Sequence, residues 1–340
     1  MIRMIASDLD GTLLLDSRTV SRQNRLVLAR AAASGIEVVI ASGRVLTSLP
    51  ESVFQIPGIR YAITSNGAAI YRIPDTSANS DVFRSESIPE ASDAFRLNTE
   101  YHFQADSCTE SRTDFQKILT RNPQNYSDSF RNRLLSAKRI FHHPLTEKSV
   151  LDLLELTSSY PSNRFPISYE VFINGVAYTC TSYVNEPSRF GASSAYVSYV
   201  KSTRIMKDDI RDFIYQHRSE LDGLDLVVGD VVLCAKLRNQ IRNILPDLYT
   251  TSSVPNRIEN SSPQAGKGAA LSFLCSHLKI RREDTVAFGD ADNDIDLLTT
   301  AGTGIAMGNA TDPCRKAADY ITGRFDRDGV ADALCSRFAI

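Results

Sequence analysis

The chain has 340 residues and a mass of 37.6 kDa, more than one hydrophobic core usually organises, so we expect two domains. Hydrophobic residues make up 42% and charged residues 23%, which excludes a disordered or collagen-like chain. Lys and Arg total 38 against 40 Asp and Glu, so the formal net charge of -2 gives no overall positive field for nucleic acid or anionic lipid. A phosphate-bearing partner therefore needs a local binding site.

Cysteine spacing and the lack of long apolar runs indicate the compartment. The six cysteines are widely separated, with no pair at the two-residue gap of a metal or redox motif, so we expect reduced thiols. No run of eighteen apolar residues could span a bilayer, and an acidic residue at position 8 comes too early for a signal peptide. We expect a cytoplasmic protein without membrane or nucleic-acid partners. The oligomeric state stays unknown.

The first seventy residues alternate short apolar runs with helical patterns, which is typical of βαβ units and a parallel sheet. Ile2–Ala6 is the first expected strand, and residues 37–41 and 61–64 form the next two. Between the first two strands, Ser21 is placed to cap a helix and Gly35 to end it.

The same alternation returns near the C-terminus. Helices are expected at residues 268–278 and 295–300, and strands at 285–288 and 304–307. Both ends of the chain therefore look like parts of one α/β domain.

The middle of the chain has a different pattern. Asn174-Gly175 lies between the apolar runs 168–173 and 176–181, which is the strongest short signal for a β-hairpin. A hairpin belongs to an antiparallel or mixed sheet, so we expect a second α+β domain at about residues 145–255, inserted into the first. Residues 74–137 are polar with irregular apolar positions, and we assign them no fold.

Two carboxylates directly follow the first expected strand, in the segment Asp8-Leu9-Asp10-Gly11-Thr12. Open α/β sheets bind ligands at the carboxyl ends of their strands. A carboxylate can attack phosphorus when a cation neutralises its repulsion from phosphate, so we expect Asp8 to be a nucleophile. Asp10 would protonate the leaving oxygen and later accept a proton from water. The plainer alternative is an acidic turn in which Gly11 permits an unusual backbone angle.

A second acidic cluster, Gly289-Asp290-Ala291-Asp292-Asn293-Asp294, follows another expected strand and opens a helix. Hard oxygen ligands at such a strand end suit Mg²⁺. Asp290 and Asp294 are four residues apart, about one helical turn, so both can face the same point. The alternative is an acidic helix N-terminus stabilised by the helix dipole.

Two further segments carry groups that suit a phosphate. Ser42-Gly43-Arg44 ends a strand with a hydroxyl and backbone N–H groups, and Lys267 lies between two glycines before a helix. Each has an ordinary alternative: Ser42 could cap a helix, and Lys267 could be a solvated side chain.

Together these four segments resemble, in their order along the chain, the motif set of the haloacid dehalogenase superfamily. Ser65-Asn66-Gly67-Ala68, with residues 266–268 and 289–294, resembles in particular the Cof-type branch, subfamily IIB, whose members hydrolyse phosphate esters with Mg²⁺. The resemblance covers residues 1–72 and, more diffusely, 138–340.

The resemblance implies a Rossmann-like α/β core with a parallel sheet and an inserted α+β cap domain. The core would comprise residues 1–72 and 256–340, and the cap residues 138–255. Residues 73–137 would be an accessory insertion of unknown fold, longer than the connection usual there. We expect it to leave the tip of a hairpin that joins residues 68–71 to 139–141.

The resemblance also implies roles for the site residues. Asp8 would be nucleophile and Mg²⁺ ligand, and Asp10 acid/base with its backbone carbonyl on the metal. Asp290 would bind Mg²⁺ directly, and Asp294 through water or from just outside the ligand sphere. The phosphoryl group would be held by the Leu9 backbone, Ser42, Gly43, Lys267 and Asn293.

The implied function is a Mg²⁺-dependent phosphatase that hydrolyses small phosphorylated metabolites, sugar phosphates by default, through an aspartyl-phosphate. A phosphomutase of the same superfamily and a regulatory binding protein without catalysis are the alternatives. The clustered carboxylates argue against the binding protein, because a retired site has no need for mutually repelling charges. A Rossmann dehydrogenase is excluded, since no glycine-rich dinucleotide loop follows the first strand. Candidate specificity residues in the cap are Tyr169, Glu170, Tyr183, Tyr199 and Arg204.

Overall fold

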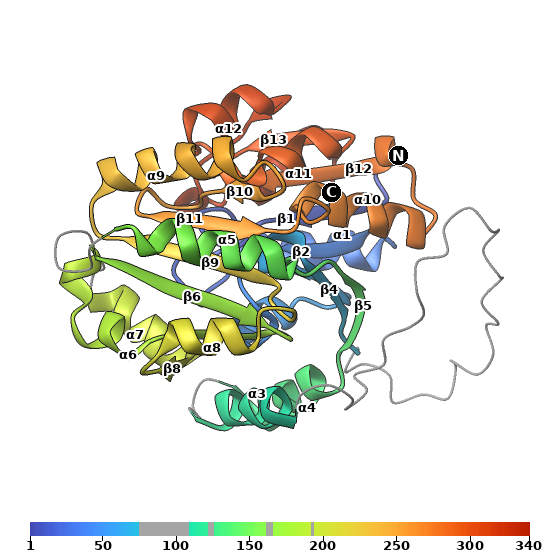
Figure 1. Cartoon of the computed structure of the whole chain (residues 1–340). Coiled ribbons are helices and arrows are strands. Elements are labelled where there is room, and N and C mark those ends of the chain that lie inside the picture. Colours follow the sequence, from blue (N-terminus) through green and yellow to red (C-terminus); the bar gives the residue numbers. More distant parts are fainter. Residues whose placement is uncertain (75–108, 122–125, 161–165, 192–193) are drawn as a thin grey trace, which may run out of the picture.

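The computed structural model describes residues 1–74, 109–121, 126–160, 166–191 and 194–340. Within these ranges the chain forms two β-sheets with helices packed on them (Figure 1). The larger sheet is built from both ends of the chain and the smaller sheet from its middle, as the sequence pattern predicts.

The larger sheet contains eight strands from the described residues: β1 (Met4–Ser7), β2 (Glu37–Ala41), β3 (Tyr61–Thr64), β4 (Ala69–Arg72), β5 (Lys138–His142), β12 (Thr285–Gly289), β13 (Thr303–Ala306) and β14 (Tyr320–Ile321). Their order is β14-β13-β12-β1-β2-β3-β4-β5. The pairs from β14 to β3 are parallel, and β4 and β5 add an antiparallel edge. This is the predicted parallel core, with β1 near its centre.

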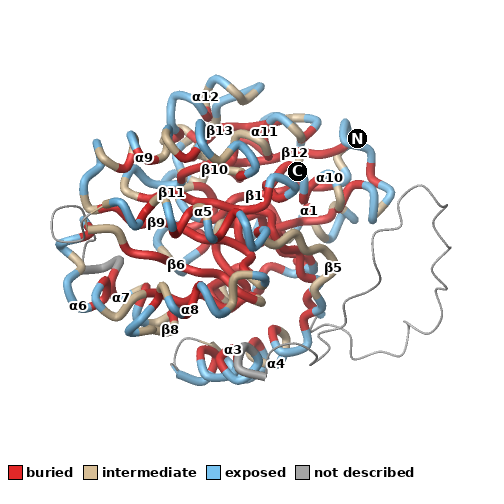
Figure 2. Tube along the Cα trace, in the orientation of Figure 1, coloured by how far each residue is buried: buried red, intermediate tan, exposed pale blue. Residues whose placement is uncertain are grey.

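Helices cover both faces of the larger sheet. These helices are α1 (Arg22–Ala33), α10 (Lys267–His277), α11 (Ile295–Thr300), α12 (Asp312–Ala317) and α13 (Gly329–Phe338). Ile5 of β1 packs in the same cluster as α1 and α13, whereas Met4 and Ala6 pack with α10, α11 and α12. The inner strands β1, β2, β3 and β12 are consequently buried along their length (Figure 2), whereas the edge strands β5 and β14 are partly or fully exposed. Burial of both faces explains why the strands read as continuous apolar runs.

Short helical turns occupy the loops at the ends of these strands. They are α2 (Glu51–Phe54), η1 (Leu46–Ser48), η2 (Ser65–Gly67), η4 (Arg282–Asp284), η5 (Asp292–Asp294) and η6 (Phe325–Arg327).

The smaller sheet forms the cap. Its strands are β6 (Ile167–Ile173), β7 (Val176–Cys180), β8 (Arg204–Lys207), β9 (Gly223–Val228), β10 (Tyr249–Thr251) and β11 (Arg257–Ser261), in the order β10-β11-β9-β6-β7-β8. Its helices are α5 (Glu147–Ser158), α6 (Thr181–Asn185), η3 (Pro187–Phe190), α7 (Ser194–Thr203), α8 (Ile210–Gln216) and α9 (Val231–Ile244). Antiparallel and parallel pairs both occur, so this is the mixed sheet that the hairpin signal predicted.

Local signals set several of these elements. Asn174 and Gly175 both have positive φ, at 51° and 77°, and they join β6 to β7 in the predicted hairpin with Ile173 opposite Val176. The Ser21 hydroxyl accepts a hydrogen bond of 3.0 Å from a backbone N–H in the first turn of α1, which is the predicted cap.

Two strands belong to a different domain from the one that the expected cap boundaries, residues 138 and 255, assign to them. β5 begins at residue 138, where the cap was expected to start, yet it pairs with β4 in the larger sheet. β11 follows the expected cap end at residue 255, yet it pairs with β9 and β10 in the smaller sheet. The pairing of β5 with β4 is the hairpin expected for residues 139–141, whereas the pairing of β11 with β9 and β10 was not expected from the local sequence.

The described part of the 73–137 insertion contains two helices, α3 (Thr109–Arg121) and α4 (Asp128–Leu135). The segment does connect β4 to β5, which pair as the predicted hairpin; residues 75–108 lie outside the described ranges. The two helices bury Phe115, Phe130 and Leu134 in the main hydrophobic cluster. α3 contacts both η1 of the core and β7, β8 and α7 of the cap, so this part of the insertion is packed structure and not a surface addition (Figure 1).

Adjacent leucines of α4 test this packing. Leu134 is 1% exposed and Leu135 is 45% exposed. Leu134→Ala is expected to lower the free energy of unfolding by about 2–5 kcal/mol, because it leaves a cavity under the helix. Leu135→Ala is the control and should change it by about 0.5 kcal/mol or less. Urea denaturation measures both, and equal small effects would mean that α4 does not stabilise the fold.

Candidate active site

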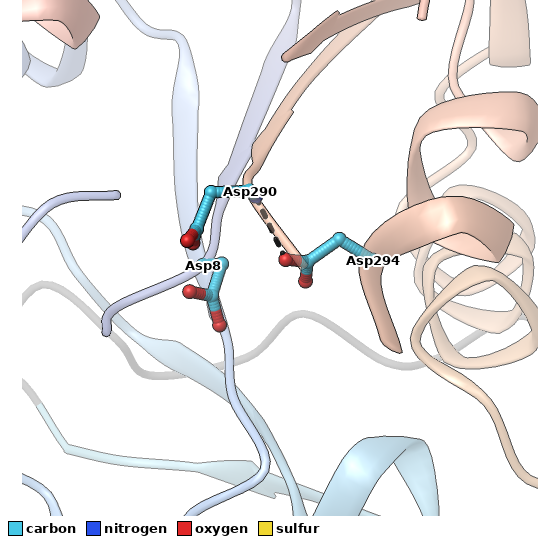
Figure 3. A group of neighbouring side chains, drawn as sticks. All are labelled: Asp8, Asp290 and Asp294. Carbon is cyan, nitrogen blue, oxygen red and sulfur yellow. Dashed lines mark hydrogen bonds between the residues drawn. The ribbon is translucent and has the colours of Figure 1, made fainter. Parts of the chain in front are cut away.

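Three carboxylates meet at the carboxyl edge of the larger sheet. Asp8 follows β1, Asp290 follows the neighbouring parallel strand β12, and Asp294 ends η5. One carboxylate oxygen from each residue lies within 4.8 Å of the others. Figure 3 shows the three side chains converging, with the Asp290 N–H donating to Asp294 Oδ2 at 2.9 Å. Parallel pairing of two distant strands thus brings the two acidic motifs together as predicted.

Lys267 lies between two of these carboxylates. It is the first residue of α10, its side chain is fully buried, and its Nζ donates to Asp8 Oδ1 at 2.7 Å and to Asp294 Oδ1 at 2.6 Å. Burial alone would lower the pKa of Lys267, but Asp294 and Asp8 together hold it above its ordinary value. Lys267 is therefore a buried cation inside the site and not a solvated lysine.

One ammonium group does not balance three carboxylates. Burial, reinforced by Asp294, raises the pKa of Asp8 well above its ordinary value. The same two causes raise the pKa of Asp290 to about 7. Buried, mutually repelling carboxylates of this kind fit a divalent cation, since hard oxygen donors suit such an ion and its charge would relieve the repulsion.

Gly11 and Thr12 of the first motif both contact Asp290. The Thr12 hydroxyl donates to Asp290 Oδ1 at 2.9 Å. Gly11 has a φ of +77°, and a Cβ at that position would lie 2.4 Å from Asp290 Oδ2. Gly11 therefore has the unusual backbone angle that the sequence suggested. Its lack of a side chain also leaves room for the Asp290 carboxylate. Asn309, which the sequence analysis missed, donates to Asp290 Oδ2 at 3.2 Å.

Asp10 lies apart from this carboxylate cluster. Its side chain is 57% exposed, and both of its oxygens accept hydrogen bonds from Arg44, at 2.8 Å from Nε and 2.6 Å from Nη2. Arg44 was noted in the sequence only as the neighbour of Ser42 and Gly43. The Ser42 hydroxyl is buried and accepts from the Arg44 N–H at 3.1 Å, so it does stabilise the local turn.

A chain of amide and carboxylate groups connects Asn293, next to the carboxylate cluster, to the cap. Asn293 Nδ2 donates to Asn66 Oδ1 at 3.0 Å, and Asn66 Nδ2 donates to Glu259 Oε2 of β11 at 3.1 Å. Gly43 faces the same amide, because a Cβ on it would lie 3.0 Å from Asn66 Oδ1. Asn66 was quoted as a family motif without a role, and no local pattern marks Glu259.

A cavity of about 600 Å³ opens above the carboxylates, between core and cap. Its core wall includes Asp8, Asp10, Gly43, Asp290 and Asn293. Leu9 packs its side chain in the hydrophobic core, and Lys267 lies fully buried beneath the carboxylates.

The cap wall of the cavity includes Phe172, Tyr199, Arg204, Asp225, Arg257 and Glu259. Tyr199 and Arg204 were expected candidates, and both line the cavity. Glu170 lies beneath the wall, fully buried, where it accepts hydrogen bonds from Arg204 and Arg257. Tyr169 lies elsewhere in the cap, against Thr157, and Tyr183 packs on Phe190 behind Arg257, outside the lining of the cavity.

A family model described as haloacid dehalogenase-like hydrolase matches residues 5–133 and 134–334. The chain belongs to this family. The resemblance seen in the motifs is thereby confirmed. In the described part of this hydrolase, no helix is both long enough and apolar enough to cross a membrane.

Curated relatives align with this hydrolase along its whole length. The phosphatase YwpJ of Bacillus subtilis is 28% identical, covering 98% of this chain and 99% of the relative. The 5-amino-6-(5-phospho-D-ribitylamino)uracil phosphatase YcsE of the same organism is 24% identical, covering 98% and 94%. Family membership and relatives of this kind make the protein a phosphatase.

Solved structures share its fold. A haloacid dehalogenase-like hydrolase from Bacillus subtilis has a TM-score of 0.68 at 23% identity, covering 99% of this chain and all of that one. The subclass IIB sugar phosphatase BT4131 has a TM-score of 0.65 at 16% identity, with the same coverage. The predicted Rossmann-like core with a cap is therefore the observed fold.

The buried ammonium of Lys267 is expected to stabilise the fold as well as the site. Lys267→Met leaves Asp8 and Asp294 buried without their cation, so the free energy of unfolding without divalent cations should fall by about 3–5 kcal/mol. Lys148→Met is a matched control, because Lys148 pairs with Asp152 on the surface and should matter little. Urea denaturation in excess chelator measures both. A variant Lys267→Met as stable as the control would contradict the assigned ion pairs.

Proposed function

We propose that this phosphatase hydrolyses small phosphate monoesters with Mg²⁺, through an aspartyl-phosphate formed on Asp8. The observation that carries the proposal is the Asp8 carboxylate at the floor of the cavity, beside Asp290, Asp294 and the buried Lys267. Sugar phosphates remain the default substrates and the cytoplasm the expected location.

In the first half of the proposed reaction, an Asp8 oxygen forms a bond to phosphorus while the ester P–O bond breaks. The leaving oxygen takes a proton from Asp10. In the second half, a water oxygen forms a bond to the phosphorus of the aspartyl-phosphate while the bond from the Asp8 oxygen to phosphorus breaks. Asp10 accepts a proton from that water, and inorganic phosphate leaves with the Asp8 carboxylate restored. The Leu9 backbone, Ser42, Gly43, Lys267 and Asn293 would hold the phosphoryl oxygens.

Asp8, Asp290 and the Asp10 carbonyl would hold Mg²⁺, with Asp294 acting from outside. A bound Mg²⁺ neutralises the charge that accumulates between phosphate and carboxylates. Like charges a few ångströms apart repel by several kcal/mol at an effective dielectric constant of about 20, so the phosphate dianion needs this compensation.

The cap wall supports a hydroxyl-rich leaving group. Asp225 and Glu259 offer carboxylate oxygens as acceptors, Arg257 offers donors, and Tyr199 and Phe172 offer aromatic faces. Burial, reinforced by Glu259, raises the pKa of Asp225 well above its ordinary value. Hydrogen bonds donated by substrate hydroxyls would relieve the repulsion between these two carboxylates. The relative YcsE is named for a phosphorylated ribityl compound, which is a substrate of this chemical kind.

The experiment for the catalytic proposal is phosphate release from a panel of sugar phosphates, nucleotides, pyridoxal phosphate and flavin mononucleotide. Chelation should stop activity, Mg²⁺ should restore it, and Asp8→Asn should abolish it while circular dichroism stays unchanged. Substantial activity in Asp8→Asn, or full activity in excess chelator, would contradict the proposal. Transfer of phosphate to a sugar instead of water would identify the phosphomutase alternative.

A second experiment tests the leaving-group pocket. Asp225→Asn should lower kcat/KM for the best sugar phosphate by about ten- to a hundredfold relative to 4-nitrophenyl phosphate, because hydrogen bonds to charged groups contribute about 1.5–3 kcal/mol. Glu186→Gln is the control, since Glu186 is an exposed carboxylate of the cap outside the cavity. If Asp225→Asn changed kcat/KM as little as Glu186→Gln does, Asp225 would not take part in substrate recognition.

A further inference from the structure

Arg44 directs its guanidinium at Asp10 and at the surrounding backbone. Its Nε and Nη2 form the two parallel hydrogen bonds to the Asp10 carboxylate. Its Nη1 donates to the carbonyl oxygens of Ser17, at 2.9 Å, and Ser48, at 3.2 Å. The Arg44 side chain is only 7% exposed. Contacts on three sides therefore fix the plane of the guanidinium, which in turn fixes the plane of the carboxylate.

This clamp leaves Asp10 able to exchange a proton. A carboxylate has about four lone-pair positions, and Arg44 takes one on each oxygen, so each oxygen keeps another. Asp10 lines the cavity, and its side chain is more than half exposed there. Without Arg44, a half-exposed carboxylate in a loop would sample several rotamers, and proton transfer depends on orientation.

Residues of the cap also contact Arg44 and its surroundings. The ring of Tyr199, in α7, contacts two guanidiniums: the Arg44 Cζ is 4.8 Å and the Arg204 Cζ 5.0 Å from the ring centroid. Arg204 Nη1 also donates to the Ser48 hydroxyl at 3.3 Å, while Arg44 binds the Ser48 carbonyl. Core and cap thus meet at Arg44 through an aromatic ring and a shared serine.

Other contacts hold Arg204 in place. Its Nη2 donates to the buried Glu170 at 3.1 Å, and its carbonyl oxygen accepts from Arg121 of α3 at 3.1 Å. The insertion helix therefore supports the cap residue that stacks on Tyr199.

We propose that Arg44 is the positioning residue for Asp10, and that Tyr199 makes the orientation of Asp10 depend on the docked cap. The proposal rests on the proposed function, because it assigns how the acid of that reaction is oriented. Tyr199 and Arg204 line the cavity that would receive the leaving group. The groups that orient Asp10 therefore also lie near the leaving oxygen that Asp10 would protonate.

The test separates proton donation from the rest of the reaction. Single-turnover formation of the phosphoenzyme is measured with a sugar phosphate, whose leaving oxygen needs a proton, and with 4-nitrophenyl phosphate, whose leaving group departs as an anion. Arg44→Lys keeps the charge but loses the bidentate geometry. Arg44→Lys should lower the rate of phosphoenzyme formation from the sugar phosphate by about tenfold or more relative to its effect on the rate with the aryl ester. The same selective loss is expected of Asp10→Asn.

Two comparisons show that Arg44 acts through Asp10. The double variant Arg44→Lys, Asp10→Asn should be little slower than Asp10→Asn alone, because the clamp has no acid left to orient. On the cap side, Tyr199→Leu should show a smaller selective loss with the sugar phosphate. Tyr199→Phe keeps the ring, so its ratio of the rates with the two substrates should equal that of the wild type. Arg22→Lys, at an exposed arginine of α1, is the control.

The outcomes are distinct. Equal slowing of both substrates by Arg44→Lys, or losses that multiply in the double variant, would overturn the positioning role. If Tyr199→Leu had the same ratio of rates with the two substrates as the wild type, the orientation of Asp10 would not depend on the cap. Absence of any phosphoenzyme in the wild-type protein would instead overturn the proposed function itself.

Discussion

The buried ion pairs of Lys267 are the constraint on which this structure depends. An ammonium without solvent contact must be surrounded by acceptors, and here they come from the end of β1 and from η5. The approach is possible because small residues line it: a Cβ on Gly67 would lie 2.0 Å from the Gly266 carbonyl oxygen. Gly67 and Gly266, quoted in the sequence only as parts of motifs, let η2 and the start of α10 pack closely enough to place Lys267 beside Asp8.

The sequence predicted those parts of the site that parallel strands bring together. Asp8 and Asp290 each end an apolar run, and adjacent parallel strands place such ends at one edge, so their meeting could be inferred without coordinates. The hairpin at Asn174-Gly175 was equally predictable, because a two-residue turn with positive φ strongly restricts the residues that can form it.

What the sequence did not reveal depends on contacts between elements. Asn66 in η2 and Glu259 in β11 of the cap are 193 residues apart, so no local pattern links them. The partnership of Arg44 with Asp10 needs the path of a loop that carries no periodicity. Helix α4 did have a signal, since Ser127 caps it and Phe130 and Leu134 are four residues apart, but charged neighbours obscured the short apolar stripe.

The order of strands in the larger sheet has a consequence for biosynthesis. β1 lies between β2, which follows it closely, and β12, which is about 280 residues further along the chain. While the ribosome makes the cap, one side of β1 has an unpaired row of backbone groups, and Asp8 has no lysine beside it. An open edge of this kind is a site for pairing with other chains. Completion of the sheet and neutralisation of Asp8 both wait for the last quarter of translation, because β12 and Lys267 both lie there.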